Sequence, residues 1–328
     1  MEKREQLFLG VDGGGTKTAA WLGVERDGQV QVLAKAVGEA SNPRAVGLER
    51  AMDVVGRVVR RAQQQLSEHQ DATFEAACLC LAGAGRTEEQ HTISQWCKQA
   101  GIANRCRVVD DSQALFAART GEANRAGIVL IAGTGSICWG RDDRGRDYRA
   151  GGWGYLLGDQ GSGFALGSAA VSAILEGAVL EDGRRTSLPQ ANGEGLAELT
   201  RAILNHWSLQ QIGEIVPVVY GHQDSRGLLA SVAPLVFELV NVSETANRIV
   251  RDGAEHLARL VAIVARQMEL EQLNSLAVAG GALVAQPIYR QLVQESLQHQ
   301  GVTVGEMEII EDPVVGALRL AVALAKSD

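Results

Sequence analysis

The sequence predicts an α/β protein built from two related domains, and three observations carry this prediction. Apolar runs that suit buried strands end in glycine turns and alternate with longer segments of helical spacing. A unit of strand, glycine loop and strand at the start of the chain recurs about 120 residues later. At 328 residues the chain also exceeds the usual size of a single hydrophobic core.

The first element is a short buried strand in the stretch from Leu7 to Thr18, which reads LFLGVDGGGTKT. Asp12 ends the strand, and three glycines follow that let the backbone bring its N–H groups close to an anion. Two hydroxyls and a cation come next. We interpret the stretch as a phosphate loop, with Asp12 placed to hold a hydrated Mg²⁺ ion. The residues assigned to this loop are Gly13, Gly14, Gly15, Thr16 and Lys17.

A tight hairpin is the structural alternative for the same stretch. The stretch does not fit a P-loop, because Thr16 separates the last glycine from Lys17. It does not fit the dinucleotide fingerprint either, because Ala19 to Val24 resembles a second strand where that fingerprint requires a helix.

The rest of the first domain alternates strands and helices. Asp27-Gly28 between two apolar runs predicts a hairpin turn, and a helix of about 20 residues follows, with Met52 to Leu66 at helical spacing. Further strands are expected at Ala76 to Ala82 and at Arg107 to Asp110, with a helix through Cys97 between them. The last of these strands delivers Asp111 at its carboxyl end, where ligands bind in α/β sheets.

The pattern restarts at Gly127. A strand to Ala132, the turn Gly133-Thr134-Gly135-Ser136 and a second strand from Ile137 repeat the opening layout. The economical explanation is a pair of related domains facing each other across a cleft, each contributing one phosphate loop.

The densest glycine region spans Gly151 to Gly163 and contains Trp153. It suits a loop shaped against a ligand, and a plain glycine-rich connector is the alternative. From Phe164 to Met268 the pattern is mostly helical, with breaks at 181–192 and 221–223.

The chain closes with two short strands and two helices. The strands are expected at Leu276 to Ala279 and at Val302 to Val304, and Gly280-Gly281 after the first suits close approach to a flat group such as adenosine. Asp312 fits the N-cap of the last helix, with Pro313 in its first turn.

Composition narrows the function classes. The net charge of −8 argues against binding to nucleic acid. Five scattered cysteines form neither a disulfide framework nor a repeated metal motif, and Cys78 and Cys80 suit a strand's buried face. The N-terminal apolar run stops at Asp12, too short for a signal peptide, and no later run would span a bilayer. We expect a cytoplasmic protein without a membrane partner.

Five ordered motifs together resemble the N-acetylglucosamine kinase branch of the BadF/BadG ATPase family, which belongs to the actin, hexokinase and Hsp70 superfamily. They are DGGGT, GTGS, GGWG followed by GDQGSG, AGG and VVGA. The resemblance implies two ribonuclease-H-like, actin-like ATPase domains, over 1–120 and over 121–313 with a helical insertion. The helix over 314–328 would return to the first domain. ATP and Mg²⁺ are the implied cofactors, and we expect a homodimer.

The resemblance also implies roles for single residues. Asp12 would govern Mg²⁺ through water, and Asp111 would accept the proton of the sugar hydroxyl. Thr16 and the three glycines before it would hold the terminal phosphates. The other implied nucleotide contacts are Thr134, Gly135, Ala230, Gly280, Gly281 and Ala282. The implied sugar contacts are Asn42, Asp111, Ser136, Gly152, Trp153 and Asp159.

One position departs from the family pattern. Ile137 follows GTGS where the animal enzyme has a polar amide, so one sugar contact and the identity of the 2-substituent stay open. The expected reaction is ATP-dependent phosphorylation of an amino sugar, N-acetylglucosamine at its 6-hydroxyl, with glucosamine or N-acetylmuramic acid as alternative substrates. Two other functions are alternatives on the same fold: an ATPase that activates an iron–sulfur dehydratase, and a non-enzymatic sugar sensor or chaperone.

Overall fold

A computed structural model describes residues 5–66, 72–119, 126–177, 179–181, 185–187 and 195–327. The chain divides into two compact units. Unit 1 comprises Met1–Arg125 together with Ile310–Asp328, and unit 2 comprises Ala126–Ile309. The predicted domain boundary between residues 120 and 121 lies outside the described residues.

Unit 1 contains a five-stranded mixed sheet in the order β3-β2-β1-β4-β5. Its strands are β1 (Phe8–Gly13), β2 (Thr18–Arg26), β3 (Gln29–Gly38), β4 (Phe74–Leu81) and β5 (Ala103–Val109). Strand β1 runs antiparallel to β2 and parallel to β4. The predicted Asp27-Gly28 turn is confirmed: both residues have positive φ, 52° and 76°, as the commonest two-residue hairpin turn requires.

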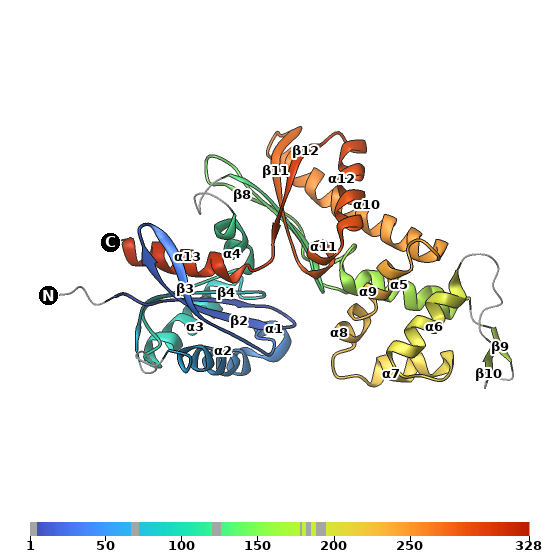
Figure 1. Cartoon of the computed structure of the whole chain (residues 1–328), viewed down its shortest axis with the longest axis horizontal. Helices are drawn as coiled ribbons and strands as arrows, with labels where there is room; N and C mark the ends of the chain where they lie inside the picture. Colours follow the sequence, from blue (N-terminus) through green and yellow to red (C-terminus); the bar gives the residue numbers. More distant parts are fainter. Residues whose placement is uncertain are drawn as a thin grey trace. The chain divides into compact units, whose positions relative to one another are not determined.

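Helices cover both faces of this sheet. Leu9 and Val11 of β1 point into a core shared with α2 (Leu48–Gln63) and α3 (Thr87–Gln99), whereas Phe8 points into a second core shared with α13. The second face carries α4 (Asp111–Ala118) and α13 (Val314–Lys326) (Figure 1). Because side chains alternate along a strand, Asp12 lies on the face covered by α4 and α13. A short helix, α1 (Pro43–Val46), precedes α2.

Glycines allow α13 to lie directly on its neighbours. A Cβ atom on Gly10 of β1 would overlap the backbone of Leu318, and one on Gly316 would overlap the carbonyl oxygen of Ala114 in α4. The predicted N-cap of α13 is wrong, however. Pro313 takes that position with helical dihedral angles and no side chain caps the helix, because the fixed φ of proline already starts the turn after Asp312.

The sheet of unit 2 repeats the first one. Its order is β12-β11-β6-β7-β8, so β6, β7, β8, β11 and β12 occupy the positions that β1 to β5 hold in unit 1. The strands are β6 (Gly127–Ala132), β7 (Ser136–Arg141), β8 (Asp147–Gly151), β11 (Gln272–Ala279) and β12 (Thr303–Ile310). Strand β6 is antiparallel to β7 and parallel to β11, as β1 is to β2 and β4. The predicted α/β fold with an internal repeat is confirmed.

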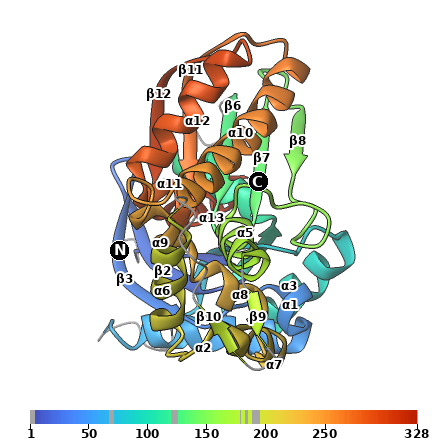
Figure 2. The ribbon, with the colours of Figure 1, turned by 90° about the vertical axis from the view of Figure 1, so that its right-hand side faces the viewer.

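A helical segment lies between β8 and β11. It comprises α5 (Gly163–Glu176), α6 (Leu196–His206), a 3₁₀ turn (Ile212–Glu214), α7 (Ile215–Gly221), α8 (Ser225–Ala230), α9 (Ala233–Glu238) and α10 (Glu244–Gln267). Helix α10 packs on β6, β7 and β8, and α12 (Pro287–His299) lies beside it after the short α11 (Gly281–Ala285) (Figure 2).

The predicted helix breaks are only partly described. Near the first break, β9 (Val179–Glu181) pairs antiparallel with β10 (Arg185–Ser187), and most of 181–192 lies outside the described residues. The second break follows α7, which ends at Gly221. In the described part of the chain, no helix combines the length and the apolar character needed to cross a membrane.

Candidate active site

The first glycine loop forms the tip of a hairpin. Asp12 pairs with Ala19 across β1 and β2, so the hairpin alternative for this stretch is structurally correct. Gly14 donates its N–H to the carbonyl of Lys17 at 2.9 Å and accepts a bond from the Ser41 N–H at 3.2 Å. Gly15, Thr16 and Lys17 are exposed at the tip. The loop is therefore fixed at its base and accessible at the residues predicted to meet phosphate.

A buried hydroxyl pair supports the loop. Thr18 Oγ1 donates to the Glu39 carbonyl at 2.6 Å and lies 2.8 Å from Ser41 Oγ. A Cβ atom on Gly13 would overlap Ser41 Oγ, so this position requires glycine. Asn42 lies next to this pair, where its Oδ1 accepts from the Arg44 N–H at 2.9 Å and caps α1. Its side chain also lies against Gly83 in the turn after β4.

Two half-buried carboxylates lie on one face of unit 1. Burial raises the pKa of Asp12 to about 6, against the lowering effect of Lys17. Burial also raises the pKa of Asp111 well above its usual range, and the negative charges of Asp110 and Asp12 act in the same direction. Asp110 is the N-cap of α4, where its Oδ1 accepts from the Ser112 N–H at 3.2 Å. Asp111 is thus held in the first turn of α4, close enough to Asp12 for their charges to interact.

The surroundings of Asp12 fit a hydrated Mg²⁺ ion. Among the described residues, no group of three or more His, Cys, Asp or Glu side chains could hold a metal by itself. Mg²⁺ commonly keeps several waters and binds one or two carboxylates together with substrate phosphates. A partly desolvated carboxylate beside an exposed glycine loop matches that requirement.

The second glycine loop, Gly133–Ser136, is a tight turn packed inside unit 2. Gly133 donates its N–H to the Gly135 carbonyl at 2.9 Å and accepts a bond from the Gly163 N–H at 2.7 Å. Gly280 has φ of 88°, and a Cβ atom there would lie 2.5 Å from the carbonyl group of Ala132. This close approach brings Gly280 against the 133–136 loop.

Asp159 joins this loop to its neighbours. The residue is only 5% exposed and adopts a positive φ of 62°. Its Oδ1 accepts from the Ser136 N–H at 3.3 Å, and its Oδ2 accepts from Nη2 of Arg226 at 3.3 Å. Burial raises the pKa of Asp159, while these donors and the Gly154 N–H act against the rise. The carboxylate therefore fastens three segments of unit 2 to one another.

The GGWG segment forms a partly exposed surface. The side chain of Trp153 is 68% exposed, and the Arg149 guanidinium lies 5.2 Å from its ring centroid. Arg149 Nη2 also donates to the Gly152 carbonyl at 2.6 Å. The side chain of Ile137 lies where a Cβ atom of Gly152 would be. The residue that follows GTGS thus makes an apolar contact with the predicted sugar segment.

The remaining predicted residues divide between packed and exposed positions. Ala230 ends α8, and its carbonyl oxygen is 3.7 Å from the position of a Cβ atom on Gly163, close to the 133–136 loop. Ala282 packs against the core of unit 2, whereas Gly281 is exposed. The structure thus groups Thr134, Gly135, Ser136, Asp159, Ala230 and Gly280 in unit 2. In unit 1 it groups Asp12, the first glycine loop, Asn42 and Asp111.

Sequence reasoning missed three residues in these groups. Asp110 adjoins Asp111, and a carboxylate directly before a helix is a recognisable cap signal. Ser41 has no local signal, because its buried bond to Thr18 joins residues 23 positions apart. Arg226 is 67 residues from its partner Asp159, and no local pattern reveals such a pair.

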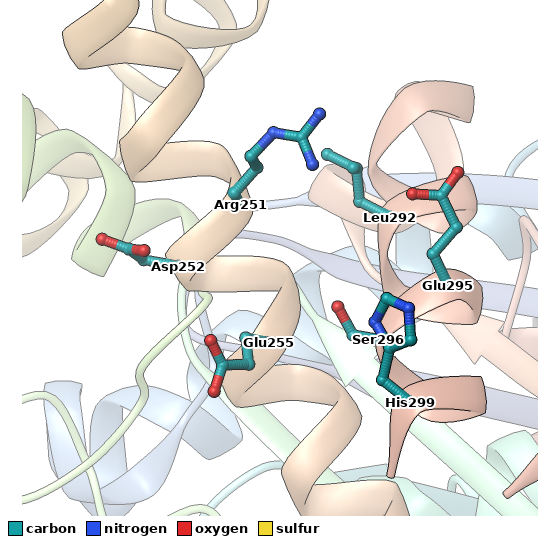
Figure 3. A pocket seen from close by; sticks show the side chains of 7 residues that line it. All are labelled: Arg251, Asp252, Glu255, Leu292, Glu295, Ser296 and His299. Carbon is teal, nitrogen blue, oxygen red and sulfur yellow. The ribbon is translucent and has the colours of Figure 1, made fainter. Parts of the chain in front are cut away.

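A separate groove of about 180 Å³ lies between α10 and α12 (Figure 3). It is lined by Arg251, Asp252, Glu255, Leu292, Glu295, Ser296 and His299. None of the predicted site residues lines it, and its side chains carry charges of both signs. We assign it no role in the candidate site.

Comparison with known proteins identifies the family of the chain. Residues 9–321 match the BadF/BadG/BcrA/BcrD ATPase family. The chain belongs to this family. The resemblance inferred from the five motifs is therefore confirmed at family level.

Two curated relatives of this BadF/BadG family member are similar over most of their length. An N-acetyl-D-glucosamine kinase of Dictyostelium discoideum is 28% identical over 97% of this chain and 98% of its own. An N-acetylmuramic acid/N-acetylglucosamine kinase of Clostridium acetobutylicum is 27% identical over 85% of this chain and 86% of its own.

Solved structures agree with the BadF/BadG fold. A Chromobacterium violaceum protein provisionally named N-acetylglucosamine kinase superposes with a TM-score of 0.71 at 26% identity, covering 98% of this chain and 99% of its own. A ROK family glucokinase of Streptomyces griseus, solved with glucose and AMPPNP, reaches 0.59 at 18% identity, covering 97% and 99%. The second likeness concerns the fold alone.

Proposed function

We propose that this chain transfers the γ-phosphoryl group of ATP to the 6-hydroxyl of an amino sugar, with N-acetylglucosamine as the preferred acceptor. Membership of an ATPase family supports the use of ATP. The names of the two curated relatives support an N-acetylated amino sugar as acceptor. A cytoplasmic homodimer is part of the same proposal, and sedimentation of the purified chain checks the oligomeric state.

The observation that carries the proposal is the pair of carboxylates, Asp12 and Asp111, beside the first glycine loop. Phosphoryl transfer needs little covalent chemistry from the protein and depends on positioning and on charge neutralisation. One carboxylate near a phosphate loop suits a metal ion, and a second one with a raised pKa suits a general base.

Each residue would then have a distinct task. Gly13 to Lys17, and Thr134 with Gly135, would bind the phosphates through backbone and hydroxyl groups, and Gly280 to Ala282 with Ala230 would bind the adenosine. Asn42, Ser136, Gly152, Trp153 and Asp159 would orient the sugar. Asp111 would accept the proton of the 6-hydroxyl group while the hydroxyl oxygen of the sugar attacks the γ-phosphorus of ATP. Mg²⁺ bound through Asp12 would neutralise charge on the phosphates.

The apolar contact between Ile137 and Gly152 supports the N-acetyl sugar over glucosamine. Glucosamine carries an ammonium group that loses hydration against an apolar surface, whereas an acetamido group is neutral and ends in a methyl. We expect Mg-ATP turnover, followed by ADP release, to be faster with N-acetylglucosamine than with glucosamine, N-acetylmuramic acid or glucose. Turnover confined to glucose, or ATP hydrolysis without an acceptor, would contradict the proposal.

Asp111→Asn tests the general base. We expect kcat to fall about 100-fold or more, the usual contribution of such a base, with sugar affinity kept because asparagine retains the shape. Asp110→Asn is the comparison variant: asparagine caps a helix as well as aspartate does, but the change removes the charge and alters the hydrogen bond that raise the pKa of Asp111, so it should shift the pH profile of turnover and leave the base in place. Initial rates and sugar titrations of both variants give the comparison. Near-normal turnover in Asp111→Asn removes the residue from its role.

The alternative of an ATPase that activates an iron–sulfur dehydratase has less support. Cys78, Cys80, Cys97 and Cys138 are buried, and Cys106 is partly buried. Thiols in these positions are poorly placed to hold a cluster shared with another subunit. A purified protein that contains iron and is coloured would reopen this alternative.

A further inference from the structure

Arg226 lies against the second glycine loop. Its Nη2 atom is 2.8 Å from the position that a Cβ atom on Gly135 would take, so the guanidinium occupies space that only glycine leaves open there. Arg226 belongs to α8, whose last residue, Ala230, lies close to the same loop through Gly163. The residue thus brings a positive charge to the loop that the proposed function assigns to phosphate.

Two contacts hold the guanidinium in place. Its Nη2 donates to Asp159 Oδ2 at 3.3 Å, and its central carbon lies 5.7 Å from the ring centroid of Tyr155. Asp159 also accepts from the N–H groups of Ser136 and Gly154. The carboxylate therefore stays hydrogen-bonded if the guanidinium turns towards another anion.

The Arg226 guanidinium can donate more hydrogen bonds than the one it makes to Asp159. A guanidinium has five N–H donors, and Nε of Arg226 is buried without a hydrogen-bond partner among the residues that the structure describes. Buried donors without a partner cost free energy, so the arrangement gains stability from a further acceptor. The side chain is 31% exposed, which leaves room for a ligand to reach it.

The charge balance of the loop favours a phosphate as that acceptor. The turn Gly133-Thr134-Gly135-Ser136 carries no cation, and no lysine occurs anywhere between residues 126 and 309. Backbone N–H groups alone leave much of the charge of a triphosphate uncompensated. Arginine matches phosphate oxygens with its planar fork of donors and keeps its charge when partly buried.

We propose that Arg226 contacts the terminal phosphates of the bound nucleotide and neutralises their charge at the 133–136 loop. The inference rests on the proposed function, because it takes this loop as a phosphate site. It adds a catalytic residue from the helical segment that no motif in the sequence had indicated.

Calorimetric binding to the full chain tests the proposal without turnover. The probes are AMPPNP with Mg²⁺ and adenosine, which share the adenosine part and differ in the phosphates. We expect Arg226→Gln to weaken AMPPNP binding ~10-fold or more, as loss of a charge-assisted bond does, and to leave adenosine binding within about twofold. Arg226→Lys keeps the charge and loses the planar fork of donors. Its AMPPNP affinity should lie between that of the wild type and that of Arg226→Gln.

Arg259→Gln is the matched control. Arg259 lies on the exposed face of α10 and pairs with Glu255 at 3.2 Å, so the same substitution there should leave AMPPNP affinity unchanged. Equal losses for AMPPNP and adenosine in Arg226→Gln would mean a structural role and overturn the proposal. Unchanged AMPPNP affinity, or a loss confined to N-acetylglucosamine binding, would overturn it as well.

These outcomes also separate the inference from the proposed function. If the wild-type chain phosphorylates no amino sugar but its AMPPNP affinity depends on Arg226, the proposed function fails and the inference stands. If it phosphorylates N-acetylglucosamine while Arg226→Gln binds AMPPNP normally, the inference fails and the function stands.

Discussion

At the scale of single residues, the candidate site keeps carboxylates where water solvates them poorly. Asp12 lies next to the last residue of β1, on the same face as the apolar side chain of Phe8, and burial raises the pKa of Asp12 from 3.8 to about 6. A charge held in this way lowers the stability of the free protein, because the attraction of Lys17 offsets burial only in part, and a bound cation would offset more of it. Asp12 is thus suited to a ligand at the cost of folding free energy.

This cost predicts that Asp12→Asn stabilises the free protein. The pKa of Asp12 is higher in the folded chain than in the unfolded chain, so the folded chain binds more protons than the unfolded one between about pH 4 and 6. The stability that comes from this proton binding is present below about pH 4 and is lost as the pH rises through about 6. The two-unit shift corresponds to ~3 kcal/mol at neutral pH. We expect a gain of ~1–3 kcal/mol in the free energy of unfolding at pH 7.5 and less than ~1 kcal/mol at pH 4.

Urea unfolding of both proteins without Mg²⁺ or nucleotide measures this difference at the two pH values. A gain of equal size at both pH values would mean that the substitution acts through packing and not through the charge. A loss of stability at pH 7.5 would contradict the raised pKa.

At the scale of elements, Asp111 depends on a helix of eight residues that is held by another helix. Nη1 of Arg319 in α13 lies within 3.0 to 3.2 Å of the carbonyl oxygens of Ala117, Ala118 and Arg119, at the C-terminal end of α4. A cation there binds carbonyls that lack partners within the helix and opposes the negative end of its dipole. The first turn, which carries Asp111, is therefore steadied from the opposite end.

Arg319→Gln should consequently lower both stability and turnover. We expect a loss of ~1–2 kcal/mol in the free energy of unfolding, as for other helix-end contacts of a partly buried cation, and a larger effect on kcat than on the KM for sugar. Lys326→Gln on the same helix is the control. Its exposed pair with Glu25, at 2.5 Å, should contribute less than ~1 kcal/mol. Equal effects of both substitutions in denaturation and in initial rates would contradict a specific role for Arg319.

Secondary structure could be predicted where local pattern and tertiary environment agree. The 120-residue repeat of strand, loop and strand was readable because both copies are apolar and end in glycine. Strand β12 was predicted only at 302–304 but spans Thr303–Ile310. Its residues Gly305, Glu306 and Glu308 break the apolar alternation, as is common on edge strands, which face solvent and carry charge.

The candidate site could likewise be predicted only where a local pattern marks its residues. Residues inside glycine motifs could be found because close backbone approach needs glycine, as Gly280 illustrates against the backbone of Ala132. Side chains that join distant segments left no local sign. The bonds of Arg226 and Ser41 exist only once the chain has folded.

At the scale of the whole molecule, unit 1 is made from both ends of the chain. Helix α13 contributes Val314, Ala317, Leu318, Ala321 and Val322 to the core that covers Phe8, Cys78 and Cys80. Unit 2, in contrast, is one continuous segment with its own core. The two units therefore have different requirements for folding.

Truncation after residue 310 should unfold unit 1 selectively. Removing α13 uncovers an apolar sheet face, a loss much larger than that of a single core side chain. We expect fragment 126–309 to unfold cooperatively when expressed alone, and fragment 1–125 to bind a hydrophobic dye and aggregate unless a peptide of residues 311–328 is added. A cooperative unfolding transition of fragment 1–125 alone would contradict this division.

The late position of α13 has a consequence for biosynthesis. The strands of unit 1 leave the ribosome before unit 2, yet the helix that shields one side of them is translated only after all of unit 2. Until α13 has been translated, the nascent chain exposes the apolar sheet face that this helix covers, and a chaperone could bind there. Synthesis of α13, and not emergence of the strands, is then the event that completes the unit containing both Asp12 and Asp111.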